Sequence, residues 1–296
     1  MDLTTDEARA AMWNRYAFVC SRQESRLSKK GREIRQVPDR YKKEFQKSDF
    51  DEWRKWVHYD AVEIVPDDVV ATLNKDEVLP LRPVRTDKNE ATRGNKSFDA
   101  HPLKAKTRLV CPGYADPQAL ANQLKTDSPT LSDEATALIY AEAAGSNWRL
   151  EQGGVDSAFL NGRYVDPDRV IYYKVPKGGL PAIPEYNWPE LPAGTILKAK
   201  KAGYGLKDAP LQWYLEHSTQ ILSLKGAFKS KLDPSLFMFR DDQGKVDGFI
   251  GVHVDDDLIT GSERFFTEVV EKLKKKFVYG KWHTANRQGE SFEHCG

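Results

Sequence analysis

Three consecutive carboxylates, Asp255, Asp256 and Asp257, interrupt an apolar stretch late in the chain. The run before them, 249–254, contains three β-branched residues, and residues 258–259 return to apolar character directly afterwards. Two short runs of this kind joined by a tight acidic tip predict a β-hairpin. Adjacent carboxylates repel one another unless a cation lies between them, and oxygen-rich sites of this kind suit Mg²⁺ or Mn²⁺. A solvated surface turn is the competing interpretation, so the rest of the chain must decide.

A second group of residues with chemical potential is the alternating basic set Lys104, Lys106 and Arg108. Alternation places the three side chains on one face of a predicted strand. Such side chains can grip phosphates, arginine through paired hydrogen bonds and lysine as a point charge. A solvated strand face would produce the same pattern.

The hydrophobic pattern predicts the elements that must position these residues. A cap at 130–133 begins an alanine-rich helix that Gly145 ends, and Pro210 fits the first turn of a helix that runs to about Leu224. Residues 263–276 have the spacing of an amphipathic helix. Strands are predicted over 104–114, from 148 toward a turn before 162, over 196–201 and over 233–240.

The first part of the chain carries no motif with a specific chemistry. Ser48 with Asp51 predicts the start of a helix whose Trp53 and Trp56 enter the core. The other expected parts are a helix over 6–20, a solvated charged stretch over 21–47 and a short strand over 61–65.

Composition sets the outer limits. The 296 residues contain 45 Lys and Arg against 44 Asp and Glu, a net charge of +1, so any nucleic-acid contact must come from local basic patches. Three widely spaced cysteines argue against a disulfide framework and for a reducing compartment. No apolar run approaches the ~20 residues that a membrane span needs, and the start of the chain has no signal-peptide pattern. We therefore expect a soluble, intracellular protein.

Several short blocks follow one another in a specific order. They are Arg-Leu-Val (108–110), Ala-Phe-Leu-Asn-Gly (158–162), Tyr-Gly-Leu-Lys-x-Ala-Pro (204–210), Trp-Tyr (213–214), Asp-Pro-Ser-Leu-Phe (233–237) and Val-Asp-Asp (254–256). In order and spacing they resemble the reverse transcriptase of copia-type LTR retrotransposons. The resemblance covers roughly 79–296, and 292–296 resembles the beginning of the primer grip.

The resemblance implies an α+β right-hand polymerase fold, in which an antiparallel palm sheet is backed by helices and β-rich fingers fold over the nucleotide. No thumb or RNase H domain is expected within this chain. The implied division is a partly helical, basic lead-in over 1–78, fingers over 79–145, palm with the first catalytic strand over 146–162, a second fingers part over 163–205, and palm to the start of the primer grip over 206–296.

The resemblance also implies roles for individual residues. Asp255 and Asp256 match the paired catalytic, metal-binding aspartates of two-metal nucleotidyl transfer. The implied nucleotide-binding residues are Lys106 and Arg108 at the triphosphate, Phe159 as the aromatic gate against a ribose 2′-hydroxyl, Val155, and Gly205 and Lys207 in the loop beneath the nascent base pair.

The sequence departs from the family at Gly154, where the family has a third catalytic carboxylate. Asp156 is not expected to replace it, because two strand residues lie about 6.6 Å along the chain and Mg²⁺ tolerates little distortion. Two lesser departures are His253, where the family usually has tyrosine, and Asp257, where an apolar residue is usual. We expect Asp257 to share a face with Asp255 and to add an unpaired charge. Nucleotidyl transfer should therefore be impaired.

The implied cofactors are two Mg²⁺ or Mn²⁺ ions. The implied partners are an RNA template with a DNA primer, deoxynucleoside triphosphates, and the integrase and RNase H of a polyprotein; no membrane is expected. The cytoplasm, within a virus-like particle, or the nucleus is the expected location. A catalytically dead nucleic-acid-binding remnant is the main alternative, with salt-dependent duplex binding as its signature. A metal-dependent nuclease that uses the acidic tip alone lacks support from any phosphate loop or His/Asp cluster.

Overall fold

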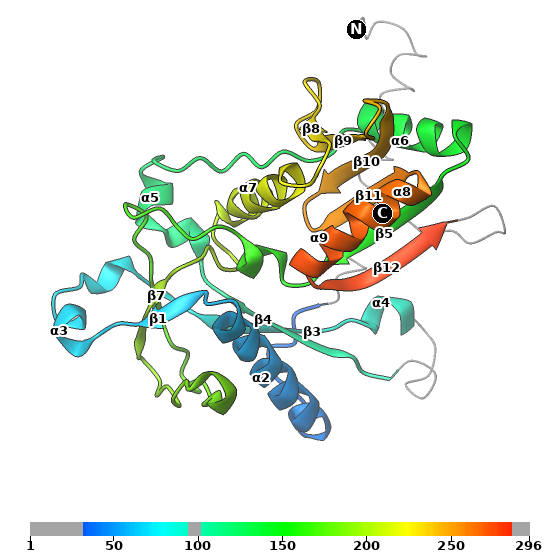
Figure 1. The fold of residues 1–296 in the computed structure, drawn as a ribbon. Coiled ribbons are helices and arrows are strands. Elements are labelled where there is room, and N and C mark those ends of the chain that lie inside the picture. Colours follow the sequence, from blue (N-terminus) through cyan, green and yellow to red (C-terminus); the bar gives the residue numbers. More distant parts are fainter. Residues whose placement is uncertain (1–31, 94–101, 286–296) are drawn as a thin grey trace, which may run out of the picture. The chain divides into compact units, whose positions relative to one another are not determined.

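The computed structural model describes residues 32–93 and 102–285 (Figure 1). The helix predicted over 6–20 and the primer-grip start predicted over 292–296 lie outside these ranges. Contacts divide the described chain into two compact units. One contains the described residues up to Glu52 together with Pro83–Leu109, and the other contains Trp53–Arg82 and the chain from Val110 onward. Across the described ranges, no helix combines the length and apolarity that crossing a membrane requires.

The smaller unit contains η1 (Asp39–Tyr41), the first part of α2 (Lys42–His58), α4 (Glu90–Arg93) and a two-stranded sheet of β3 (Arg82–Asp87) and β4 (Ala105–Val110). The prediction that a helix starts at Ser48 is wrong, because α2 begins six residues earlier. The Ser48 hydroxyl instead accepts a hydrogen bond from the Thr107 amide at 2.8 Å. Asp49 accepts from the Thr107 hydroxyl at 2.7 Å and pairs with Arg85 at 2.6 Å, so the helix holds both strands.

The larger unit is built on a six-stranded antiparallel sheet in the order β12-β5-β11-β10-β9-β8. The acidic tip lies between β10 and β11, as the hairpin prediction requires. The strands are β5 (Arg149–Val155), β8 (Ala227–Lys229), β9 (Leu236–Arg240), β10 (Val246–His253), β11 (Asp256–Gly261) and β12 (Tyr279–Ala285).

Helices cover both faces of this sheet because successive strand residues point to opposite sides. On one face, Phe249 and Leu258 pack in a core cluster with Ile139 of α6 (Asp133–Gly145). On the other face, Ile250 and Ile259 pack with α7 (Ala209–Leu222) and with the segment formed by α8 (Glu263–Phe265), the π-helical turn η6 (Phe266–Val270) and α9 (Glu271–Lys276). Figure 1 shows these helices over the sheet. The mixed α+β class is therefore confirmed.

Two predicted helices are confirmed, with one correction. Pro210 lies in the first turn of α7, as predicted. The start of α6 differs, because its cap is Ser132 and not Thr130. The Ser132 hydroxyl accepts a hydrogen bond from the Ala135 amide at 3.2 Å, three residues on, where a capping side chain must reach.

A second sheet in the larger unit has the order β1-β7-β6-β2. Its strands are β1 (Val62–Ile64), β2 (Val78–Pro80), β6 (Tyr172–Lys174) and β7 (Ile196–Ala199), and short helices lie at α3 (Asp67–Val70), η2 (Lys75–Glu77), η3 (Gly113–Ala115), α5 (Pro117–Leu120), η4 (Ala158–Asn161) and η5 (Pro184–Tyr186). Trp53 and Trp56 are buried, which confirms their predicted place in the core.

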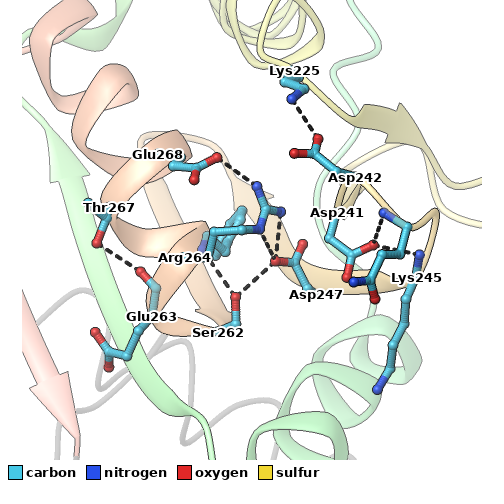
Figure 2. A network of polar contacts seen from close by, with 12 residues as sticks. Lys225, Asp241, Asp242, Lys245, Asp247, Ser262, Glu263, Arg264, Thr267 and Glu268 are labelled. Atoms are coloured by element: carbon cyan, nitrogen blue, oxygen red, sulfur yellow. Dashed lines mark hydrogen bonds and ion pairs between the residues drawn. The ribbon is translucent and has the colours of Figure 1, made fainter.

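A polar network fixes the open end of the β10–β11 hairpin, away from the acidic tip (Figure 2). Asp247, at the start of β10, pairs with Arg264 at 2.7 Å and accepts from the Ser262 hydroxyl at 2.9 Å. Ser262 also caps α8, since its hydroxyl accepts from the Phe265 amide. The same contacts therefore close the hairpin and start the helix that follows it.

Candidate functional site

The acidic tip is a two-residue turn held in a strained conformation. His253 and Asp256 are directly paired, which leaves Val254 and Asp255 as the turn. Val254 has φ +59°, a left-handed conformation that is rare for a β-branched residue and costs on the order of 1–3 kcal/mol. The indole N–H of Trp213 donates to the Val254 carbonyl at 2.7 Å. This hydrogen bond from α7 thus fixes the turn, and the Asp255 side chain in the turn is exposed to solvent.

Asp256 lies directly beside Gly154 on the neighbouring strand. The register pairs the two residues, and the Val155 amide donates to the Asp255 carbonyl at 2.8 Å. A Cβ atom added to Gly154 would lie 2.9 Å from the Asp256 Oδ1 atom. The acidic tip therefore lies beside the strand that carries Val155, and position 154 faces the Asp256 carboxylate.

The charge on Asp256 is disfavoured by its surroundings. Burial is the largest cause, and the neighbouring charges of Asp255 and Asp257 add to it, which together raise the pKa of Asp256 to about 6. A hydrogen bond from Gln152 and the positive charge of Lys281 act in the opposite direction on this pKa. Carboxylates crowded in this way are stabilised by any cation that comes close to them.

Asp257 is buried and has polar partners, which corrects the expectation that it adds an unpaired charge. It follows Asp256 on β11, so its side chain points to the opposite face, where it is fully buried. The Tyr279 hydroxyl donates to the Asp257 Oδ2 atom at 2.7 Å, and the His217 Nε2 atom lies 3.3 Å from the same oxygen. Position 257, where an apolar residue was expected, therefore carries a buried carboxylate that has two polar partners.

Asp156 is also engaged elsewhere. It lies just beyond the end of β5, its amide donates to the Val278 carbonyl at 2.8 Å, and its carboxylate forms an ion pair with Lys55. This agrees with the expectation that Asp156 does not replace the missing carboxylate.

The predicted nucleotide-binding residues of the larger unit lie in three settings. Phe159 packs against Tyr204, with ring centroids 5.5 Å apart, so the predicted gate lies beside the loop that carries Gly205. Gly205 has φ +102°, and an added Cβ would lie 2.0 Å from the Cys111 carbonyl oxygen, so this backbone requires glycine. Lys207 is exposed. The Val155 side chain is buried in the hydrophobic core of the larger unit.

A buried arginine fixes the helix that follows this loop. Arg169 pairs with Asp208, the residue before α7, at 3.1 Å and also with Asp116. All three side chains are nearly inaccessible to solvent. Motif spacing did not reveal this network, because its members are far apart in the sequence.

Lys106 and Arg108 belong to the smaller unit, on β4. Thr107, which lies between them, and Leu109, which follows Arg108, are buried, whereas Arg108 is exposed. The predicted alternation of this strand is therefore confirmed.

The donor set at the tip is small. Within the described part of the chain, no group of three or more His, Cys, Asp or Glu side chains is placed to hold a metal ion. Asp255 and Asp256 offer carboxylate oxygens, and the residue paired with Asp256 is Gly154, which offers no side-chain ligand. Gln152 and Lys281 were missed by the sequence interpretation. Gln152 shares a face with Gly154 by strand alternation, whereas Lys281 could be found only from the pairing of β12 with β5.

Comparisons with known proteins agree with the sequence blocks. A family model described as reverse transcriptase (RNA-dependent DNA polymerase) matches residues 68–286. The retrovirus-related Pol polyprotein from transposon RE1 of Arabidopsis thaliana is 32% identical over 174 residues, which is 58% of this chain and 11% of that protein. Its counterpart from transposon RE2 is 31% identical over 174 residues, again 58% and 11%. The polyprotein from transposon TNT 1-94 of Nicotiana tabacum is 28% identical over 179 residues, 60% of this chain and 12% of that protein. The resemblance to copia-type retrotransposon polymerases is confirmed, over a small part of these relatives' length.

Proposed function

Because this chain belongs to the reverse transcriptase (RNA-dependent DNA polymerase) family, we propose that it is an RNA-directed DNA polymerase of a copia-type retrotransposon with severely impaired nucleotidyl transfer. One observation carries the proposed impairment: the residue paired with Asp256 is Gly154, and its missing side chain would point at the Asp256 carboxylate.

The family's divalent ions activate the primer 3′-hydroxyl and neutralise the leaving pyrophosphate when they are bound. The residues present do not fit a pair of such ions. Two ions require ligands shared between them, and here Asp255 and Asp256 are consecutive carboxylates with no third carboxylate opposite. A deficit of several kcal/mol in transition-state stabilisation corresponds to roughly three decades of rate.

The other residues keep the roles that the resemblance implies. Lys106 and Arg108 would hold the triphosphate through charge and paired hydrogen bonds. Phe159, supported by the Tyr204 ring, would collide with a ribose 2′-hydroxyl and so select deoxynucleotides. Gly205 and Lys207 would lie beneath the nascent base pair. Val155 would contribute through its place in β5, since its side chain is in the core. The division into fingers and palm remains part of this proposal.

The test is primer extension on poly(rA)/oligo(dT) with Mg²⁺ and with Mn²⁺. The variant Gly154→Asp restores the carboxylate, and Gly154→Ala adds the same Cβ without it. We expect Gly154→Asp to raise the extension rate by a factor of roughly ten to a thousand, while Gly154→Ala stays at the level of the natural chain. Equal extension by the natural chain and Gly154→Asp would reject the proposed importance of position 154.

A nucleic-acid-binding remnant is the second candidate, and the incomplete donor set at Gly154 favours it. It would bind a template–primer duplex through phosphate contacts, without extension. Duplex binding that weakens with salt, together with no extension by Gly154→Asp in either metal, would support this candidate over the polymerase. Deoxynucleoside triphosphates and the integrase and RNase H parts of a Pol polyprotein are the further partners under the first proposal.

A further inference from the structure

We propose that Lys281 competes with cations at the acidic tip: the register of the sheet places it beside Gly154, on the face of Asp256, and its positive charge weakens the binding of divalent ions to Asp255 and Asp256. This inference rests on the proposed function, since it takes these two aspartates as the cation-binding residues. It adds a second feature that disfavours metal, besides the glycine at position 154.

The sheet register places Lys281 in the same row as the two groups concerned. Asp256 is paired with Gly154 on β5, and Gly154 is paired with Lys281 on β12. Directly paired residues of neighbouring strands project from the same face of a sheet. With strands ~4.8 Å apart, the Asp256 and Lys281 Cα atoms lie about 10 Å from each other, with only the glycine between them.

An irregularity in β12 produces this placement. Tyr279 is paired with Val155, whereas Lys281 is paired with the next residue along β5, Gly154, so Gly280 is the extra residue of a bulge. Tyr279 consequently reaches the buried Asp257 on one face, while Lys281 projects on the Asp256 face. A regular strand would put glycine opposite Gly154, and the lysine would point away.

Gly154 has no side chain to fill the space between Asp256 and Lys281. A Cβ atom at position 154 would meet the Asp256 Oδ1 atom at 2.9 Å and no other heavy atom within 4 Å, so the space beside Gly154 is unfilled. A divalent ion bound at the tip would be repelled by the positive charge of Lys281, which lies two strands away on the same face.

The experiment measures Mn²⁺ binding in the absence of nucleic acid and nucleotide, by the electron paramagnetic resonance signal of free Mn²⁺. The variants are Lys281→Gln, which removes the charge, and Lys281→Arg, which keeps it. Each is made in the natural chain and in the Gly154→Asp background. We expect Lys281→Gln to tighten Mn²⁺ binding about tenfold in both backgrounds and Lys281→Arg to leave it unchanged; tenfold corresponds to ~1.4 kcal/mol.

The matched control is Lys225→Gln, which makes the same charge change elsewhere. Lys225 pairs with Asp242 in the turn before β10 (Figure 2), and the length of β10 separates that turn from the acidic tip by roughly 25 Å. Mn²⁺ affinity should not change in this variant. Lys281 and Lys225 are both exposed, so neither substitution removes core packing, and matching thermal unfolding curves will verify the fold.

Unchanged Mn²⁺ affinity in Lys281→Gln, or equal tightening in Lys281→Arg, would overturn the inference. Its failure is separable from failure of the proposed function. Absent primer extension in every variant would reject the polymerase and leave the metal-binding result standing. If Gly154→Asp extends the primer rapidly but its Mn²⁺ affinity is the same with and without the Lys281→Gln substitution, only the proposed role of Lys281 is rejected.

Discussion

Two adjacent glycines on β5 have opposite surroundings. A Cβ on Gly153 would lie 2.4 Å from the Trp282 ring, on the face where the aromatic side chains pack. A Cβ on Gly154 would meet only the Asp256 carboxylate, the free end of a movable side chain. Glycine at 153 is therefore required by packing, whereas glycine at 154 is not required by any rigid neighbour. This contrast is what makes Gly154→Asp a workable test.

The contrast predicts different stabilities for two alanine variants. Gly153→Ala should lower the free energy of unfolding by about 1–3 kcal/mol, because the indole or the strand must move. Gly154→Ala should be neutral or should raise it by up to ~1 kcal/mol, since alanine loses less backbone entropy in a strand. Urea unfolding of both variants checks this, and a loss in Gly154→Ala as large as that in Gly153→Ala would contradict it.

The pKa of Asp256 predicts a pH dependence. In the folded state this pKa is about 6, above its ordinary value of 3.8, so the folded state binds the proton more tightly than the unfolded state between these values. The contribution of Asp256 to stability is therefore largest below pH 4 and is lost as the pH rises through 6. Denaturant unfolding between pH 4 and 7.5, in metal-free buffer, should show a smaller decline for Asp256→Asn than for the natural chain. Parallel curves would contradict the assignment.

At the scale of elements, the β10–β11 hairpin is fixed at both ends by different helices. Trp213 of α7 holds the strained turn, and the Asp247–Arg264–Ser262 network closes the opposite end (Figure 2). Between them, Asp257 ties β11 to α7 through His217 and to β12 through Tyr279. The position of Asp255 and Asp256 thus depends on packing that extends well beyond the tip.

The His217–Asp257 pair predicts a coupled effect on stability. His217→Leu or Asp257→Leu alone should lower the free energy of unfolding by about 3 kcal/mol, because each leaves its buried partner without the pair. The double variant should cost less than the sum of the two by at least ~1 kcal/mol, since the lost His217–Asp257 contact is then counted only once. Additive losses in a double-mutant cycle measured by urea unfolding would show that the two side chains do not interact.

At the scale of the whole molecule, a net charge of +1 means that no overall field draws the chain to nucleic acid. Duplex binding, where it occurs, must come from local basic residues such as Lys106 on β4. Its affinity should then fall with salt in proportion to the number of phosphates contacted.

The corresponding prediction concerns the salt slope. Anisotropy titrations of a template–primer duplex at 50–300 mM KCl should give a linear plot of log affinity against log salt, and Lys106→Gln should reduce the slope by about 1. Lys225→Gln, whose lysine is paired with Asp242, should leave the slope unchanged. An unaltered slope in Lys106→Gln would remove that lysine from the proposed phosphate contacts.

Local patterns located most elements and misplaced two helix starts. The apolar periodicity of 263–276 and the proline at 210 identified their helices correctly, because these signals depend on neighbours within a few residues. Thr130 was wrong as the cap of α6 because Ser132, two residues later, competes with it, and Ser48 was wrong because it lies inside α2. Only the fold shows that the Ser48 hydroxyl accepts a hydrogen bond from β4 and that Ser132 caps α6.

The sequence by itself determined the family, the order of its blocks, the acidic tip and the glycine at position 154. Each is a property of residue types and their spacing along the chain. The tertiary structure alone decided that Asp257 faces the core and that Lys281 stands opposite Gly154. The physical reason is that strand register and the bulge at Gly280 depend on pairing between segments more than 100 residues apart, and a shift of one residue moves each side chain to the other face.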